Sequence, residues 1–335
     1  MPVTTATAAQ QNLRTQFWIT ILSVVLLSGK MIAYYSTHSV AVLSDALESI
    51  VNVISGGIGL YSLYIAAKPK DADHPYGHGK AEFVSAAVEG GLIVSAGLLI
   101  AYQAILQWVN QQTLHSLDIG LTIVGITALV NFAAGAWCLH VGKKNKSLAL
   151  QASGQHLQTD TYSTIAVVVG LLLVQLLQWF WLDKLIALAM SIYIMYNGYT
   201  IIRASLAGIM DEADAALLQS MVQTLNENRR LNWIDLHNLR VIKYGSHLHL
   251  DCHLTVPWYL NVHEAHKEVE ALEDLIKQHY GSALELFVHT DGCLPFSCSI
   301  CSKSDCVKRE RPQQQQLEWT LNNILSNQKH QAISG

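Results

Sequence analysis

Six long apolar segments constrain this chain more than any other feature of its sequence. Each holds about 20 residues or more, the length that an α-helix needs to cross the hydrocarbon core of a bilayer. Their approximate limits are Phe17–Thr37, Val40–Ala66, Phe83–Val109, Ile119–Val141, Leu148–Leu177 and Leu182–Ala207. Only 14% of the 335 residues are charged, whereas soluble domains average about 25%. The sequence therefore predicts an α-helical membrane protein with six transmembrane helices.

A polar, histidine-rich region follows Met210. Its hydrophobic periodicity indicates a helix at 214–229, strands at 235–244 and 247–256, a helix at 262–280 and a strand at 283–289. This α-β-β-α-β order predicts an α+β ferredoxin-like domain, similar to a metallochaperone. We thus expect a transmembrane domain over 1–210, a cytoplasmic domain over 211–292, and a cysteine-rich segment with a polar tail over 293–335.

The placement of lysines predicts the orientation of the helices. Two connections between apolar segments are rich in lysine, and the opposite side has only Lys184; the lysines of the rich connections are Lys68, Lys70, Lys80, Lys143, Lys144 and Lys146. By the positive-inside rule both termini are cytoplasmic, and we expect a bacterial inner or plasma membrane. The polar start, Met1–Gln16, is no removable signal peptide. The net charge of −4 gives no indication of nucleic-acid binding.

Ionisable residues lie inside two of the apolar segments. His156 and Asp160 are four residues apart in the fifth segment, so they share one face of a helix. In the second segment, Asp45, Glu48 and Asn52 also fall on one face. Such groups are costly in hydrocarbon and mark an ion path by default. The alternative is that they only link helices through hydrogen bonds.

Two further ionisable residues, Lys30 and Glu89, lie in the first and third apolar segments. We expect them to pair with each other or to line a cavity, in a structural role. A short loop between the second and third segments carries Asp71, His74 and His78. This mixture of nitrogen and carboxylate ligands suits divalent metals, although a loop with two histidines is more often inert.

Four cysteines follow the last predicted strand as Cys293-x4-Cys298-x2-Cys301-x4-Cys306. In a reducing cytosol this spacing favours metal binding over disulfides. A zinc site of all four, an exchange of ligands with His289 and Asp291, an iron–sulfur cluster and free thiols all stay open. In the polar tail, 317–325 is expected to form a short amphipathic helix, a candidate contact with a partner chain.

The combination resembles a known family. The six spans, Ser44-Asp-Ala-Leu-Glu-Ser-Ile-Val-Asn52, His74-Pro-Tyr-Gly-His-Gly-Lys-Ala-Glu82 and His156-x3-Asp160 are similar to the cation diffusion facilitators, which are metal efflux transporters. The resemblance implies an ion site on Glu48, Asn52, His156 and Asp160, with Asp45 as a substitute. It also implies a second site on Asp71, His74 and His78, and a third on His237, His253, His289 and Asp291, with His266 nearby. Lys80 and Asp211 resemble the family's charge link between domains.

The expected function is therefore proton-coupled efflux of a divalent transition metal from the cytoplasm by a homodimer in the bilayer. The metal is both substrate and regulator, and protons are the counter-ion. Zinc is the first expectation, with iron, cobalt, nickel or manganese as alternatives, because Glu48 and Asn52 depart from the His or Asp with Asp of zinc members. We expect no enzyme activity. The alternatives are an intramembrane metalloenzyme and a metal sensor anchored in the membrane.

Overall fold

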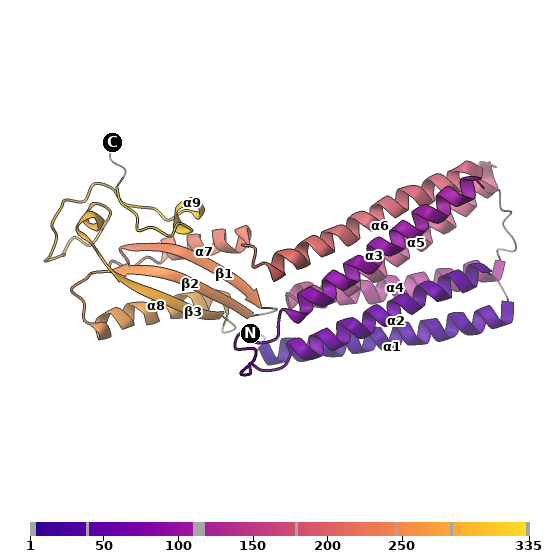
Figure 1. Ribbon diagram of the computed structural model, residues 1–335, viewed down its shortest axis with the longest axis horizontal. Helices are drawn as coiled ribbons and strands as arrows, with labels where there is room; N and C mark the ends of the chain where they lie inside the picture. The colour runs from indigo at the N-terminus through magenta and orange to yellow at the C-terminus, as the bar shows by residue number, and fades with distance from the viewer. Residues whose placement is uncertain are drawn as a thin grey trace. The chain divides into compact units, whose positions relative to one another are not determined.

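The computed structural model describes residues 5–37, 40–109, 118–177, 180–244, 247–281 and 284–332. Its contacts divide the chain into two compact units, one of which holds Thr5–Met210 while the other begins at Asp211. The elements of both units are labelled in Figure 1. Each unit is described by itself.

The described part of the first unit contains six α-helices (Figure 1). They are α1 (Thr5–Thr37), α2 (Val40–Ala66), α3 (Ala81–Val109), α4 (Asp118–Lys144), α5 (Leu148–Leu177) and α6 (Phe180–Ile209). All six predicted apolar segments thus lie in helices. Within the described residues, four stretches are long and apolar enough to cross a membrane: Ala8–Ile32, Ser49–Ala66, Ala81–Leu106 and Gly125–Lys144. The count of six spans stays a prediction.

Helix α1 begins twelve residues before the predicted apolar segment, at Thr5 rather than Phe17. The added turns carry polar side chains that are buried and hydrogen-bonded. Asn145, in the turn between α4 and α5, donates to Asn12 Oδ1 at 2.6 Å, and Gln16 donates to the carbonyl oxygen of Gly56 at 3.2 Å. Because Asn12 and Gln16 find hydrogen-bond partners inside the bundle, the helix begins earlier than hydropathy alone predicts.

Helices α3 and α6 approach closely through glycine. A Cβ atom on Gly90 would lie 2.9 Å from the carbonyl oxygen of Gly198, and a Cβ atom on Gly198 would lie 2.8 Å from that of Gly90. Such small residues let helix backbones come together in a membrane. Ile93, Ile194 and Ile201 are buried in the same core, so apolar side chains fill the rest of this interface.

The second unit contains a small mixed sheet with helices. The order is α7 (Ala215–Glu227), β1 (Asp235–Tyr244), β2 (His247–Val256), α8 (Val262–Tyr280) and β3 (Leu284–Gly292), followed by the 3-10 turn η1 (Pro295–Ser299) and α9 (Leu321–Ile324). The sheet order is β1-β2-β3, with β1 antiparallel and β3 parallel to β2. The predicted α-β-β-α-β order is present, and its assignment as ferredoxin-like stays a prediction.

The two faces of this sheet differ in polarity because side chains alternate along a strand. Every second residue of β2 from Leu248 to Val256 is buried in one core with residues of α7 and α8. The intervening residues of β2 include His249, Asp251 and His253. Register places His237 opposite His253, and His253 opposite His289. The apolar core thus aligns three histidines across the other face.

The C-terminal segment packs against its own unit rather than standing apart as a polar tail. The described helix α9 has four residues, and Trp319 and Ile324 are buried in the core with the sheet. Asn226 on α7 donates to the carbonyl oxygen of Trp319 at 2.6 Å. The helix expected over 317–325 is therefore shorter than predicted. Its apolar residues pack into the core of their own unit.

The glycine contact between α3 and α6 gives a test of the packing. We expect Gly90→Ala to lower the free energy of unfolding by about 1–3 kcal/mol, because the new Cβ meets Ile202 at 2.8 Å and the Gly198 carbonyl at 2.9 Å. Gly91→Ala is the control, since its Cβ would have no atom within 4 Å. Thermal unfolding in detergent measures both, and equal melting temperatures would contradict the packing.

Candidate metal centres

A buried polar cluster in the first unit joins three helices around His156 of α5. His156 Nδ1 lies 3.4 Å from Glu89 Oε1 of α3, and His156 Nε2 lies 3.8 Å from Asp160 Oδ1. Asn52 of α2 donates to Asp160 Oδ2 at 2.7 Å. The structure therefore brings together Asn52, His156 and Asp160, as the sequence predicted, and it adds Glu89.

Glu89 is the residue whose place in this cluster the sequence reasoning missed. Its carboxylate is 5% exposed and accepts hydrogen bonds from Ser55 at 2.8 Å and from Ser153 at 3.0 Å. It lines a small pocket together with Asn52 and His156, which agrees with the cavity alternative. Lys30 instead donates to Ser49 at 2.8 Å. A single acid on α3 carried no paired motif, so only the meeting of α2, α3 and α5 reveals it.

The other half of the predicted ion site cannot be placed in the same way. The side chains of Asp45 and Glu48 lie outside the described residues, and only their backbone is placed, in α2. Glu48 and Asn52 are four residues apart on that helix, so they share one face. Asn52 Oδ1 is buried and accepts no hydrogen bond from the described residues, which leaves an oxygen for a cation.

The loop between α2 and α3 also brings its predicted residues together. Asp71, His74 and His78 each offer a ligand atom within 4.8 Å of the others. Asp71 Oδ1 accepts from the His74 backbone N–H at 2.7 Å, and this bond lowers the pKa of the Asp71 carboxyl. His78 Nε2 lies 3.4 Å from Asp71 Oδ2. The exposed carboxylate stays ionised, the form that binds a cation.

The second unit gathers a further cluster on the polar face of its sheet. His237, His253 and Asp291 offer ligand atoms within 4.8 Å of one another. Asp291 Oδ2 lies 3.7 Å from His237 Nε2 and 3.5 Å from His253 Nδ1, and accepts no hydrogen bond from the described residues. Burial lowers the pKa of His237. A neutral imidazole beside a carboxylate with a spare oxygen is a fitting site for a transition metal.

Two other predicted residues lie at the edge of this cluster or outside it. His289 is more exposed, and its Nε2 lies 3.7 Å from Asp291 Oδ1. His266 belongs to α8 and lies 3.5 Å from Glu270 of the same helix, so the structure gives it a different neighbour. Lys80 belongs to the first unit and Asp211 to the second, and the link between them stays a prediction.

The C-terminal segment adds two residues that sequence reasoning missed. Lys329 Nζ lies 3.1 Å from Asp291 Oδ1. The ring of His330 contacts Asp235 Oδ1 at 2.6 Å, and this bond raises the pKa of His330. Asp235 in turn lies 3.5 Å from His237 Nδ1. No motif marks either residue, because Lys329 is 38 positions from Asp291 and His330 is 95 positions from Asp235 in the chain.

The four clustered cysteines are free thiols and line one pocket of the second unit. Within the part of the chain that the structure describes, their sulfur atoms do not form a third group of ligand atoms as close as the two above. The alternative of a ligand exchange with His289 and Asp291 stays a prediction too.

The chain thus combines a long apolar helical unit that holds a buried His–carboxylate cluster with a second unit that holds a His–Asp cluster, features expected of a membrane carrier of metal cations. Residues 17–210 match the family model of the cation efflux transmembrane domain, and residues 216–293 match that of the cation efflux protein cytoplasmic domain. This chain therefore belongs to the cation efflux family, the cation diffusion facilitators. It is an integral, multi-pass cation transporter and not an enzyme.

Several curated proteins are similar to this chain. An uncharacterized transporter of Synechocystis, sll1263, is 34% identical over 251 residues, which are 74% of this chain and 80% of that protein. Metal tolerance protein C1 of Arabidopsis thaliana is 28% identical over 325 residues, 91% of this chain and 68% of its own length. The cation-efflux pump FieF of Pectobacterium atrosepticum is 26% identical over 283 residues, 81% and 90% respectively.

The position of Glu89 beside His156 gives a prediction. We expect Glu89→Gln to weaken metal binding at this cluster by about 10–100-fold, the usual effect of removing a group that orients a ligand. Glu82→Gln is a matched control on α3, because Glu82 is buried but contacts Ser147 away from the cluster. Metal titration of both purified proteins measures the change. Equal affinities would remove Glu89 from the site.

Proposed function

We propose that this transporter exports a divalent transition metal in exchange for protons, through the cluster on His156. The observation that carries the proposal is the burial of one imidazole between two carboxylates, at the meeting of α2, α3 and α5. Ionisable groups inside membrane helices are expensive and mark ion paths. The proposed ligands are Asn52, His156 and Asp160, with Glu48 or Asp45 completing the set.

Exchange with protons follows from the chemistry of these ligands. A metal ion requires a neutral imidazole and an ionised carboxylate, so its binding displaces protons. An imidazole can hold either a proton or a metal ion on the same ring nitrogen, so protonation of His156 would compete with metal binding. A single site between helices that opens to each side in turn would release metal outside and return with protons.

The arrangement in the membrane is part of the proposal. Six spans would place both termini and the second unit in the cytoplasm, in agreement with the lysines of the two rich connections. The loop of Asp71, His74 and His78 would then receive metal on the cytoplasmic side. The cluster of His237, His253 and Asp291 would bind metal as a regulator of a homodimer, a role that rests on the family resemblance.

The identity of the metal is proposed from the donor set. One imidazole with several oxygen donors selects less strongly for zinc than a site with two imidazoles. Zinc, iron, cobalt, nickel and manganese therefore all remain candidates, because the order of affinities does not decide among them. The names of the similar proteins refer to metals and cations in general.

The first prediction from this proposal concerns proton coupling. His156→Ala or Asp160→Ala is expected to abolish metal-dependent proton flux in liposomes, because each removes a group that binds either metal or proton. The measurement is a pH-sensitive dye inside the vesicles after metal is added. Cross-linking of the purified variants should give the same oligomer as the wild type. Wild-type flux in both variants would refute the site.

The second prediction concerns selectivity. The exchange Glu48→His with Asn52→Asp is expected to shift transport toward zinc, since it adds an imidazole and a second carboxylate on one face of α2. Initial transport rates of zinc, iron(II), cobalt, nickel and manganese, each measured with the wild type and the variant, give the preference. An unchanged order would mean that α2 does not set selectivity.

A further inference from the structure

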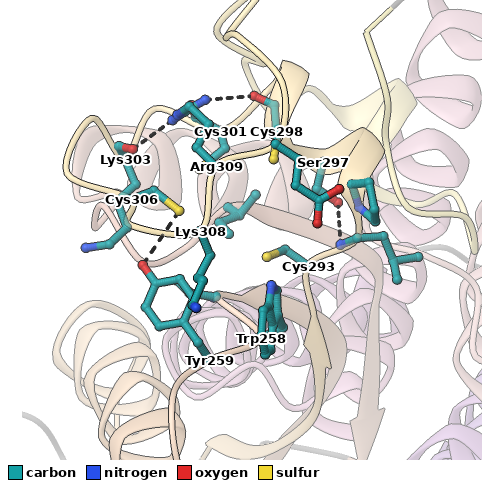
Figure 2. Close-up of a pocket in the computed structure, with 15 residues that line it drawn as sticks. Trp258, Tyr259, Cys293, Ser297, Cys298, Cys301, Lys303, Cys306, Lys308 and Arg309 are labelled. Carbon is teal, nitrogen blue, oxygen red and sulfur yellow. Dashed lines mark hydrogen bonds between the residues drawn. The ribbon is translucent and has the colours of Figure 1, made fainter.

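The cysteine cluster plays no part in the function proposed above. Its four thiols lie within residues 293–306, directly after β3. They line a single pocket with Trp258 and Tyr259 of the β2–α8 connection (Figure 2). Cys301 is buried, and the other three are half-buried. Four thiols from a short segment thus line one pocket.

The backbone of this segment is fixed largely by polar contacts. Arg309 donates to the carbonyl oxygens of Cys298 and Cys301, both at 3.1 Å (Figure 2), and to that of Lys303 at 2.7 Å. The N–H of Cys293 donates to the carbonyl oxygen of Val256 at 2.9 Å. The one-turn helix η1 is the only regular element described in 293–306. A segment of this kind, with almost no regular secondary structure, is one that a bound metal commonly stabilises.

We propose that Cys293, Cys298, Cys301 and Cys306 bind one zinc ion in a structural site, separate from the transport path. Four thiolates are soft ligands that select zinc over the harder divalent metals. Closed tetrahedral sites of four cysteines often contain a pair separated by two residues, as Cys298 and Cys301 are. The site is thus distinct from the histidine and carboxylate clusters in both ligands and role.

The surroundings of the pocket match the charge of such a site. Zinc with four thiolates carries a net charge of −2, since each cysteine loses its proton on binding. Lys303, Lys308 and Arg309 line the pocket against one acid, Glu310. Tyr259 already donates to Cys306 Sγ at 3.7 Å (Figure 2), and would remain as a donor to the bound thiolate. A zinc ion held by the four thiolates would require zinc–sulfur distances of about 2.3 Å.

The proposed zinc would also secure the C-terminal segment that follows. Beyond Cys306 the chain places Trp319 and Ile324 in the core of the unit. It then brings Lys329 to Asp291 and His330 to Asp235. Fixing residues 293–306 at the start of this path limits the freedom of the whole segment, because a cross-link removes unfolded conformations.

The test uses the full chain, purified in detergent under reducing conditions. Metal is removed with a chelator, and cobalt is added to the wild type and to Cys298→Ser with Cys301→Ser. We expect a thiolate-to-cobalt charge-transfer band in the wild type that the double variant lacks. Before chelation, the double variant should contain one zinc ion fewer per chain than the wild type. Cys252→Ser is the control, because Cys252 is a buried thiol of β2 that does not line the pocket.

A second measurement needs no variant. In the zinc-loaded wild type, reaction with a thiol reagent should be slow at four cysteines and should become fast after chelation. Equal rates with and without zinc, or a cobalt spectrum without the thiolate band, would overturn the proposal. An iron–sulfur absorption in the purified protein would also overturn it. The transport assay with the His156 variants does not affect these readouts. The zinc proposal and the transport proposal can therefore fail independently.

Discussion

The burial of His156 among carboxylates is the interaction on which the membrane unit depends. Two acids and an imidazole inside an apolar bundle are unfavourable unless each has a partner. Asn52, Ser55 and Ser153 provide hydrogen bonds to these acids. The helices that supply them must therefore meet at this cluster, and the proposed exchange of a cation for protons would take place among the same groups.

The two units gather the same kinds of side chain on different scaffolds. In the first unit, residues spaced four apart share one helix face, and the meeting of three helices brings nitrogen and oxygen donors together around His156. In the second unit, strand register does so, because His237, His253 and His289 lie across neighbouring strands. The proposed thiolate site differs chemically from both, so one chain could keep a permanently bound zinc while it exchanges another metal. The proposed structural site and the proposed transport site would thus differ in the chemistry of their ligands.

Much of this arrangement could be predicted from the sequence, because it depends on local periodicity. The limits of α2 and α5 agree with the predicted segments, and the α-β-β-α-β order of the second unit was also predicted. Spacing of four residues placed His156 with Asp160, and a short loop placed Asp71 with His78. The early start of α1 was missed because its polar residues are paired with distant partners such as Asn145.

By itself the sequence determined the helical membrane unit, the mixed α and β domain and the residue types proposed to bind metal, since hydropathy and spacing are local properties. Only the tertiary structure decided which distant groups meet. It joined Glu89 to His156, His330 to Asp235 and Lys329 to Asp291. The partners in these three pairs are 67, 95 and 38 residues apart in the chain, and no local pattern encodes such contacts. Packing of apolar faces brings them together, and their charges then define the sites.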